Sequence, residues 1–116
     1  MNKQRRAQLG KLSTKIEATR ESAVGDIEGL NAVVSRLTDY RYALDGIKDD
    51  EEEAFGNKPE ALQDDAQDDL DLFMSFVEEA DDKLCQLIDM DDETYDSDEV
   101  DTLLTDITDA LSNAQE

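Results

Sequence analysis

The chain of 116 residues has the length of one domain with a small hydrophobic core. It carries 32 acidic residues against 11 basic ones, a formal net charge of −21, which argues against direct binding of DNA, RNA or anionic lipid and favours basic partner surfaces. Its single cysteine excludes an intrachain disulfide, and no apolar run approaches the ~20 residues of a membrane span, so we expect a cytoplasmic protein.

High charge with few aromatic residues can mark a disordered chain, but the apolar residues are periodic. Residues 3–55 predict one long helix, because apolar side chains recur every three or four positions in one heptad register. That seam consists of Leu9, Leu12, Ile16, Ala23, Leu30, Val33, Leu37, Tyr40, Leu44, Ile47 and Ala54. Gly25 and Gly29 flank a polar Asp26 in the seam, so the pattern leaves open whether the helix continues or bends there.

A second helix is predicted from about residue 59 to 90, after a turn at 56–59 that holds the only proline. Pro59 suits the first turn of a helix, and Glu60 suits its positive end. The seam of this helix consists of Ala66, Leu70, Phe73, Val77, Ala80, Leu84 and Leu87. The one cysteine, Cys85, lies within the apolar pattern, so we expect a buried or half-buried thiol.

A third helix is predicted at about 97–114, after a loop at 91–96. Asp96 followed by Glu99 has the spacing of a capping box. The apolar positions of this helix are Val100, Leu103, Leu104, Ile107, Leu111 and Ala114. We therefore predict an all-α fold, a long antiparallel helical hairpin with a shorter C-terminal helix that reaches the basic N-terminal half of the first.

The apolar stripe is wider than two packed helices require. Leu62, Met74, Phe76, Ile88 and Met90 of the second helix lie beside its seam. An exposed patch of this kind is typical of an interface, so we expect a homodimer, with Leu70, Phe73, Val77, Leu84 and Leu87 as its core or dimer seam. The monomeric alternative is that the third helix covers the same surface.

The acidic residues of the second helix avoid the seam, so this helix has one apolar side and one anionic side. Between residues 60 and 93 there are 14 acidic residues, or one per ~3.6 Å of helix axis. One strand of duplex DNA carries a phosphate every ~3.4 Å. A solvated surface is the simpler interpretation, but solubility needs a net charge of only ~2–8 in a small domain. The anionic face could therefore imitate nucleic acid.

Other chemistry has weaker support. Without histidine there is no Ser-His or Cys-His pair, and no glycine-rich phosphate loop is present. The carboxylate pairs Glu78/Asp81 and Glu79/Asp82 are spaced like magnesium ligands of helical nucleotide hydrolases, but they lie away from the seam. We predict no enzyme, no cofactor and no dedicated metal site.

The segment 89–100 partly matches a calcium-binding loop. Asp89, Asp91 and Glu93 occupy its first three ligand positions, but Thr94 replaces the glycine and Val100 replaces the final glutamate. The basic residues of the N-terminus could contact nucleic acid, but pairing with the acidic third helix is the simpler interpretation; they are Lys3, Arg5, Arg6, Lys11, Lys15 and Arg20.

The segment EEEAFGNKPEALQ at 51–63, after a helix that opens MNKQRRAQL, resembles a group of small tailed-phage proteins. Those proteins share an FxNxPExLQ turn between two heptad helices, which Phe55, Asn57, Pro59, Glu60, Leu62 and Gln63 match. Gly56 departs from the acidic residue usual there. The resemblance covers about residues 1–90 and implies phage origin and a helical hairpin, but no activity.

Phages encode small acidic proteins that imitate DNA and block host defences, and this analogy favours a counter-defence inhibitor. Its expected target is a basic DNA-binding host protein: a restriction enzyme, a CRISPR effector or a nuclease. The expected contact residues are Asp64, Asp65, Asp68, Asp69, Asp71, Glu78, Glu79, Asp81, Asp82, Asp89, Asp91, Asp92 and Glu93. The alternative is a coiled-coil interaction or assembly protein whose acidic residues only solubilise it.

Overall fold

A computed structural model describes residues 3–115, and in this range the protein is all-helical, as predicted. Five helices follow one another: α1 (Lys3–Glu17), α2 (Arg20–Gly25), α3 (Ile27–Gly56), α4 (Glu60–Ile88) and α5 (Ser97–Ala114). They pack lengthwise into an elongated bundle whose Cα atoms span 52 × 20 × 18 Å. None of the described helices is both long enough and apolar enough to cross a membrane.

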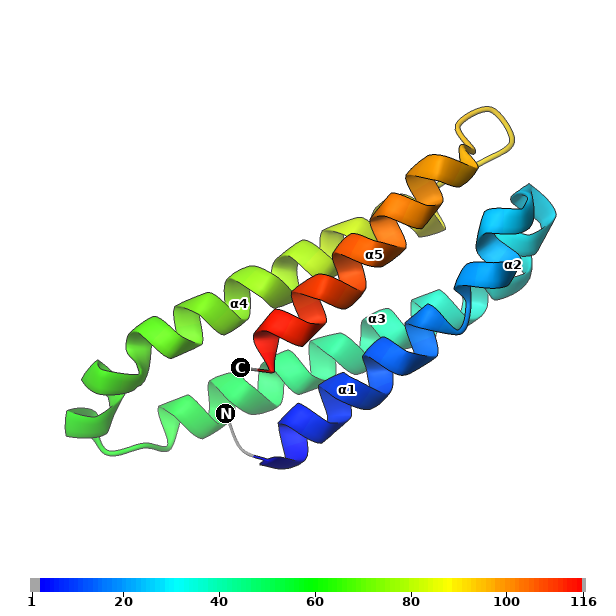
Figure 1. The fold of residues 1–116 in the computed structure, drawn as a ribbon. Helices are drawn as coiled ribbons and strands as arrows, with labels where there is room; N and C mark the ends of the chain where they lie inside the picture. Colours follow the sequence, from blue (N-terminus) through cyan, green and yellow to red (C-terminus); the bar gives the residue numbers. More distant parts are fainter. Residues whose placement is uncertain (1–2, 116) are drawn as a thin grey trace.

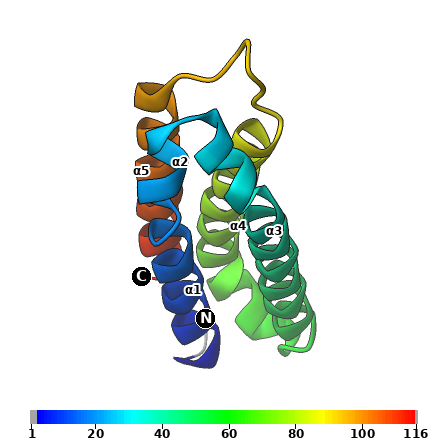
Figure 2. The ribbon, with the colours of Figure 1, turned by 90° about the vertical axis from the view of Figure 1, so that its right-hand side faces the viewer.

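The helices form a ring of four rods, with the short α2 extending α1. Helix α1 packs against α3 and α5, and α4 packs against both of these as well. Figure 2 shows α1 and α2 beside α5 on one side of the bundle and α3 beside α4 on the other. One copy of the chain therefore packs four helical rods together.

The segment 3–55 was predicted as one helix, with a bend at 25–29 left open, and the structure divides it into α1, α2 and α3. Helix α1 ends at Glu17, where the buried Thr19 hydroxyl donates to the Ile16 carbonyl at 2.7 Å. The chain then reverses at Asp26, whose backbone is extended (φ −165°, ψ 177°). The Asp26 carboxylate accepts from the Gly29 N–H at 2.6 Å and caps α3, which satisfies a free helix-end donor.

Glycine is required at position 29 by close approach between α2 and α3. A Cβ on Gly29 would lie 1.9 Å from the carbonyl oxygen of Ser22. The two glycines and the aspartate that the sequence marks as a break therefore form a reversal. As a result α1 and α2 fold back along α3 (Figure 1). The helix predicted over 3–55 is therefore not one rod paired with the helix predicted over 59–90.

The later elements lie close to their predicted positions. Helix α4 starts one residue after Pro59 and ends at Ile88, two residues before the expected end, so the loop runs over 89–96. Helix α5 covers the predicted 97–114, and the Asp96 carboxylate accepts from the Asp98 and Glu99 N–H groups at 2.9 and 3.4 Å. This bears out the N-cap at Asp96.

The predicted seams form one hydrophobic core. Nine of the eleven seam residues in 3–55 are buried, with Tyr40 and Ala54 half-buried, and so are all six of α5. In α4 the buried members are Phe73, Val77, Ala80, Leu84 and Leu87, while Ala66 and Leu70 are half-buried. The wider stripe is partly covered as well, since Met90 is buried and Met74, Phe76 and Ile88 pack against the core. Leu62 stays 53% exposed.

Candidate anionic interface

The candidate interface is the anionic face, defined as the thirteen acidic residues predicted to contact a partner on α4 and in the loop 89–93. Twelve of them are exposed, and only Asp81 is half-buried. Helix α4 presents its carboxylates outward because Phe73, Val77 and Leu84 anchor its opposite side in the core. The helix stops at Ile88, so Asp89, Asp91, Asp92 and Glu93 belong to the loop and do not extend the helical spacing.

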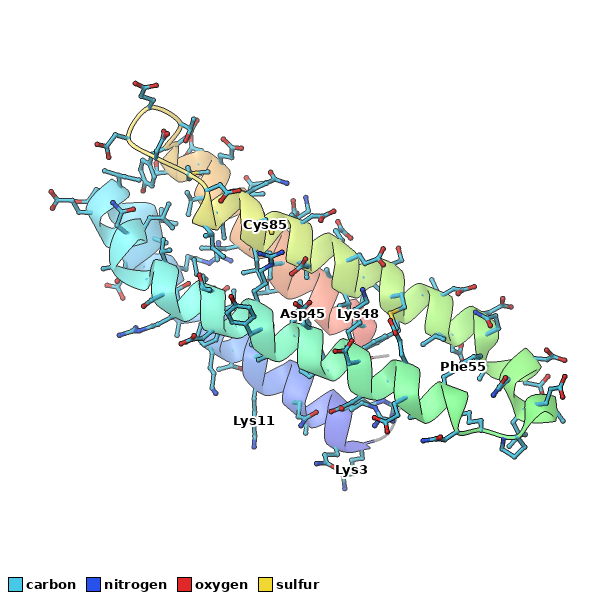
Figure 3. The ribbon with its side chains drawn as sticks, turned by 180° about the vertical axis from the view of Figure 1, so that it is seen from behind. Lys3, Lys11, Asp45, Lys48, Phe55 and Cys85 are labelled. Carbon is cyan, nitrogen blue, oxygen red and sulfur yellow. The ribbon has the colours of Figure 1, made fainter. Side chains whose placement is uncertain are left out.

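Cations of α3 approach one edge of this face. Arg41 Nε donates to the Asp81 carboxylate at 2.8 Å, and Lys48 Nζ lies 3.8 Å from Glu78. Figure 3 shows Lys48, Asp45 and Cys85 on the side where α3 and α4 meet. Asp81 is thus partly neutralised within the protein, whereas the outer carboxylates of α4 face solvent. The sequence pattern did not indicate either cation as a neighbour of α4, although Arg41 and Lys48 are seven residues apart and so share one side of α3.

Cys85 lies half-buried at the same edge. Burial raises the pKa of the thiol, and Asp81 and Asp89 act in the same direction, while Arg41 opposes them. The neutral thiol is therefore the stable form near pH 7, as expected of a packing residue.

The loop at the end of α4 is a braced turn. One carboxylate oxygen of Asp91 accepts from the N–H groups of Glu93 and Thr94 and from the Thr94 hydroxyl, each at 3.0 Å. These hydrogen bonds hold the pKa of Asp91 below its usual range. The hydroxyl of Tyr95 donates to the Ala23 carbonyl at 2.7 Å, which ties the loop to α2. The loop acids are thereby held near the end of α4.

Within residues 3–115, no three acidic or cysteine side chains are grouped so that they could hold a metal ion. The carboxylate pairs Glu78/Asp81 and Glu79/Asp82 lie on the outside of α4, and Glu78 and Asp81 face cations of α3. In the loop, Asp91 Oδ1 already accepts three hydrogen bonds within its turn.

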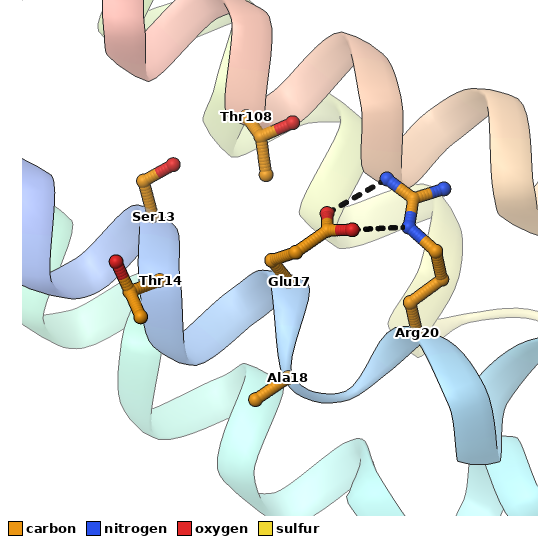
Figure 4. Close-up of a pocket in the computed structure, with 6 residues that line it drawn as sticks. All are labelled: Ser13, Thr14, Glu17, Ala18, Arg20 and Thr108. Carbon is orange, nitrogen blue, oxygen red and sulfur yellow. Dashed lines mark hydrogen bonds and ion pairs between the residues drawn. The ribbon is translucent and has the colours of Figure 1, made fainter.

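An open depression of about 640 Å³ lies between α1 and α5, lined by Ser13, Thr14, Glu17, Ala18, Arg20 and Thr108 (Figure 4). Glu17 receives two hydrogen bonds of 2.8 Å from Arg20, which lower its pKa. Arg20 also contacts the Asp101 carboxylate. The hydrogen bonds to Glu17 and Asp101 raise the pKa of the Arg20 guanidinium. The charged groups of the depression therefore satisfy one another and join α1, α2 and α5.

The basic N-terminus pairs with the third helix only in part. Arg20 contacts Asp101 of α5, but Arg5 contacts Glu51 of α3. Lys3, Arg6, Lys11 and Lys15 are exposed on α1 and make no ion pair among the described residues. Figure 3 shows Lys3 and Lys11 projecting from the edge opposite to α4. The molecule is therefore polarised, with a basic α1 and an anionic α4.

Comparison with known proteins adds no relative to this description. No protein-family model matches the chain, and searches of curated proteins and of solved structures also find no match. The resemblance to tailed-phage proteins stays a prediction from residues 1–90.

Proposed function

We propose that this protein is a non-enzymatic phage counter-defence inhibitor that acts as a DNA mimic in the host cytoplasm. Its anionic face occupies the DNA-binding surface of a host restriction enzyme, CRISPR effector or other DNA-processing protein. Lysine and arginine residues that normally hold phosphate groups bind the carboxylates instead. The observation that carries this proposal is the exposure of twelve of the thirteen predicted contact residues on one helix and its loop.

The shape of the molecule supports the proposal. The bundle is an elongated rod whose Cα atoms span 52 Å along its axis and 20 × 18 Å across it. Residues 3–115 hold 31 acidic and 11 basic residues, a net charge of −20, so each net charge takes about 2.6 Å of the 52 Å axis. A duplex carries one charge per ~1.7 Å, so the rod reaches about two-thirds of the charge density of DNA.

The rigidity of the scaffold supports it too. A DNA-binding surface is shaped for a stiff ligand, and binding costs less free energy when the ligand is already ordered. Helix α4 packs against α3 and α5, and the loop acids are held by the Asp91 turn and the Tyr95 hydrogen bond. The carboxylates are thus preorganised.

The assembly alternative relied on the seam of α4 as a dimer interface. Phe73, Val77, Leu84 and Leu87 are buried within a single copy, and only Leu70 is half-buried. A dimer through these residues would have to open the bundle, so the seam favours the core interpretation. An assembly function would need another surface.

The proposal is tested by capturing proteins from host lysate on the tagged chain, with and without excess duplex DNA. The expected result is capture of a DNA-binding protein that competing DNA displaces and whose DNA-dependent activity the chain inhibits. Capture that is indifferent to DNA, or capture without inhibition, would contradict mimicry.

A further inference from the structure

The tip of the α3–α4 hairpin, defined as residues 49–72, extends past the C-terminal end of α5 (Figure 1). Helix α5 runs antiparallel to α4 and ends at Ala114, beside Phe73 and Phe76. Helix α1 begins at Lys3 on the same side. Among the described residues, no helix therefore continues the path of α5 over the first three turns of α4.

A groove of about 540 Å³ opens at this place. It is lined by Arg6, Glu51, Phe55, Lys58, Ala66, Asp69, Leu70, Leu72, Phe73, Phe76, Asn113 and Ala114. Seven of these twelve residues are apolar, and three are phenylalanines from two helices. Phe55 lies near the end of α3, as Figure 3 shows. The groove is therefore an apolar surface framed by charges.

Two exposed leucines lie on this part of α4: Leu72 lines the groove, and Leu62 lies ten residues before it. Leu62 is 53% exposed and Leu72 is 58% exposed, the most exposed leucines of the described chain. Leu62, Leu72 and Phe76 lie within about 80° of one another around the axis of α4, and the exposed Asp65 and Asp69 lie between the two leucines on the same side. Exposed leucines on one side, next to an apolar groove, are typical of a site where a helix docks.

The groove could hold a second copy of the chain or a helix of another protein, and the charge of the tip favours the helix. Residues 49–72 hold eleven acidic residues and one lysine, a net charge of −10. A second copy would bring two such tips together, and like charges at an interface are repelled. The charged residues of the groove itself balance, with Arg6 and Lys58 against Glu51 and Asp69. A helix with lysine and arginine beside an apolar stripe would instead pair with the exposed acids around the groove.

We propose that the hairpin-tip groove binds a basic amphipathic helix of a partner protein, which completes the four-helix packing where α5 ends. The free stretch of α4 at residues 60–72 is ~20 Å long, enough for a partner helix of about 13 residues. Its apolar side chains would contact Leu62 and Leu72, which are ten residues or ~15 Å apart along α4. This surface adjoins the anionic face, since Asp69 belongs to both, and the leucine substitutions leave every carboxylate of that face in place.

The test uses a fluorescent 18-residue peptide with leucines at helical spacing and lysines elsewhere, and a scrambled peptide of the same composition. Fluorescence anisotropy should show at least tenfold tighter binding of the patterned peptide to the full chain. The double variant Leu62→Gln/Leu72→Gln should lose at least tenfold in affinity for it. Tyr42→Gln, which alters a 69% exposed side chain outside the groove, should bind like the wild type.

Equal binding of the two peptides, or equal binding by the wild type and the double variant, would overturn the proposal, because attraction would then be only electrostatic. Sedimentation of the chain alone tests whether a second copy of the chain fills the groove. A dimer that the leucine substitutions dissociate would assign the groove to a second copy and would also overturn the proposal. Circular dichroism should show that the double variant keeps its fold, since both leucines are exposed.

Discussion

At the scale of single residues, Gly29 controls the reversal of the chain. Its backbone lies so close to Ser22 that a Cβ would be 1.9 Å from that carbonyl oxygen. Neither group can move independently, because α2 and α3 are both packed in the core. We expect Gly29→Ala to lower the free energy of unfolding by about 2 kcal/mol or more, measured by urea denaturation.

Gly46→Ala is the matched control, because it makes the same change in the same helix. Nothing lies within 4 Å of a Cβ at Gly46, so the substitution should gain helix propensity and raise stability by about 0.5–1 kcal/mol. If the two variants change stability in the same direction, the close approach at Gly29 does not govern the turn.

At the scale of elements, the Asp91 turn joins α4 to α5 and holds the loop acids in place. Its hydrogen bonds lower the pKa of Asp91 in the folded state, so the carboxylate stabilises the fold above its unfolded pKa of ~3.9. This contribution is lost as the pH falls through the folded pKa. We expect Asp91→Ala to lower Tm at pH 7 and the difference from wild type to shrink towards pH 2, measured by thermal melts across pH.

Asp92→Ala is the natural control for that series, since Asp92 is an exposed neighbour. It should change Tm much less than Asp91→Ala at pH 7. A Tm difference for Asp91→Ala that is as large at pH 2 as at pH 7 would show that the ionised turn does not act as described.

The elements also show what the sequence could predict. The N-cap at Asp96 and the proline before α4 are local signals, so the starts of α4 and α5 could be located. The reversal at Asp26 could not be predicted from the apolar pattern, because Ala23 and Leu30 are seven residues apart and the heptad register continues across the break. Both residues are buried in the same core, so a period alone cannot distinguish a straight helix from a folded one.

The candidate interface was predictable to a similar extent. The pattern separated the outer carboxylates from the seam, and twelve of the thirteen are exposed. It could not reveal that Arg41 reaches Asp81, because that contact joins residues 40 positions apart through the packing of α3 on α4. The groove at the hairpin tip depends likewise on where α5 ends relative to α4.

At the scale of the whole molecule, a net charge of −21 opposes the compact state. Raising NaCl from 0.01 M to 1 M shortens the Debye length from ~30 Å to ~3 Å and screens this repulsion. The partly exposed ion pairs that salt also weakens contribute little each. We expect Tm to rise by at least about 4 °C, the shift that ~1 kcal/mol gives in a small domain. A Tm that falls with salt would mean that the ion pairs outweigh the repulsion.

The central claim is that the anionic face, and not the total charge, binds the target. The deciding measurement is the affinity for the captured DNA-binding protein over a range of salt concentrations. One variant neutralises four exposed acids of the face, by Asp64→Asn, Asp65→Asn, Asp68→Asn and Asp82→Asn. A charge-matched variant neutralises four exposed acids elsewhere, by Glu21→Gln, Glu28→Gln, Asp39→Asn and Asp109→Asn.

Mimicry predicts that the affinity of the wild type falls steeply as the salt concentration rises. The face variant should lose at least tenfold in affinity and show a weaker salt dependence. The charge-matched variant should bind within about threefold of wild type. Equal losses in the two variants, or tight binding by the face variant, would contradict the account.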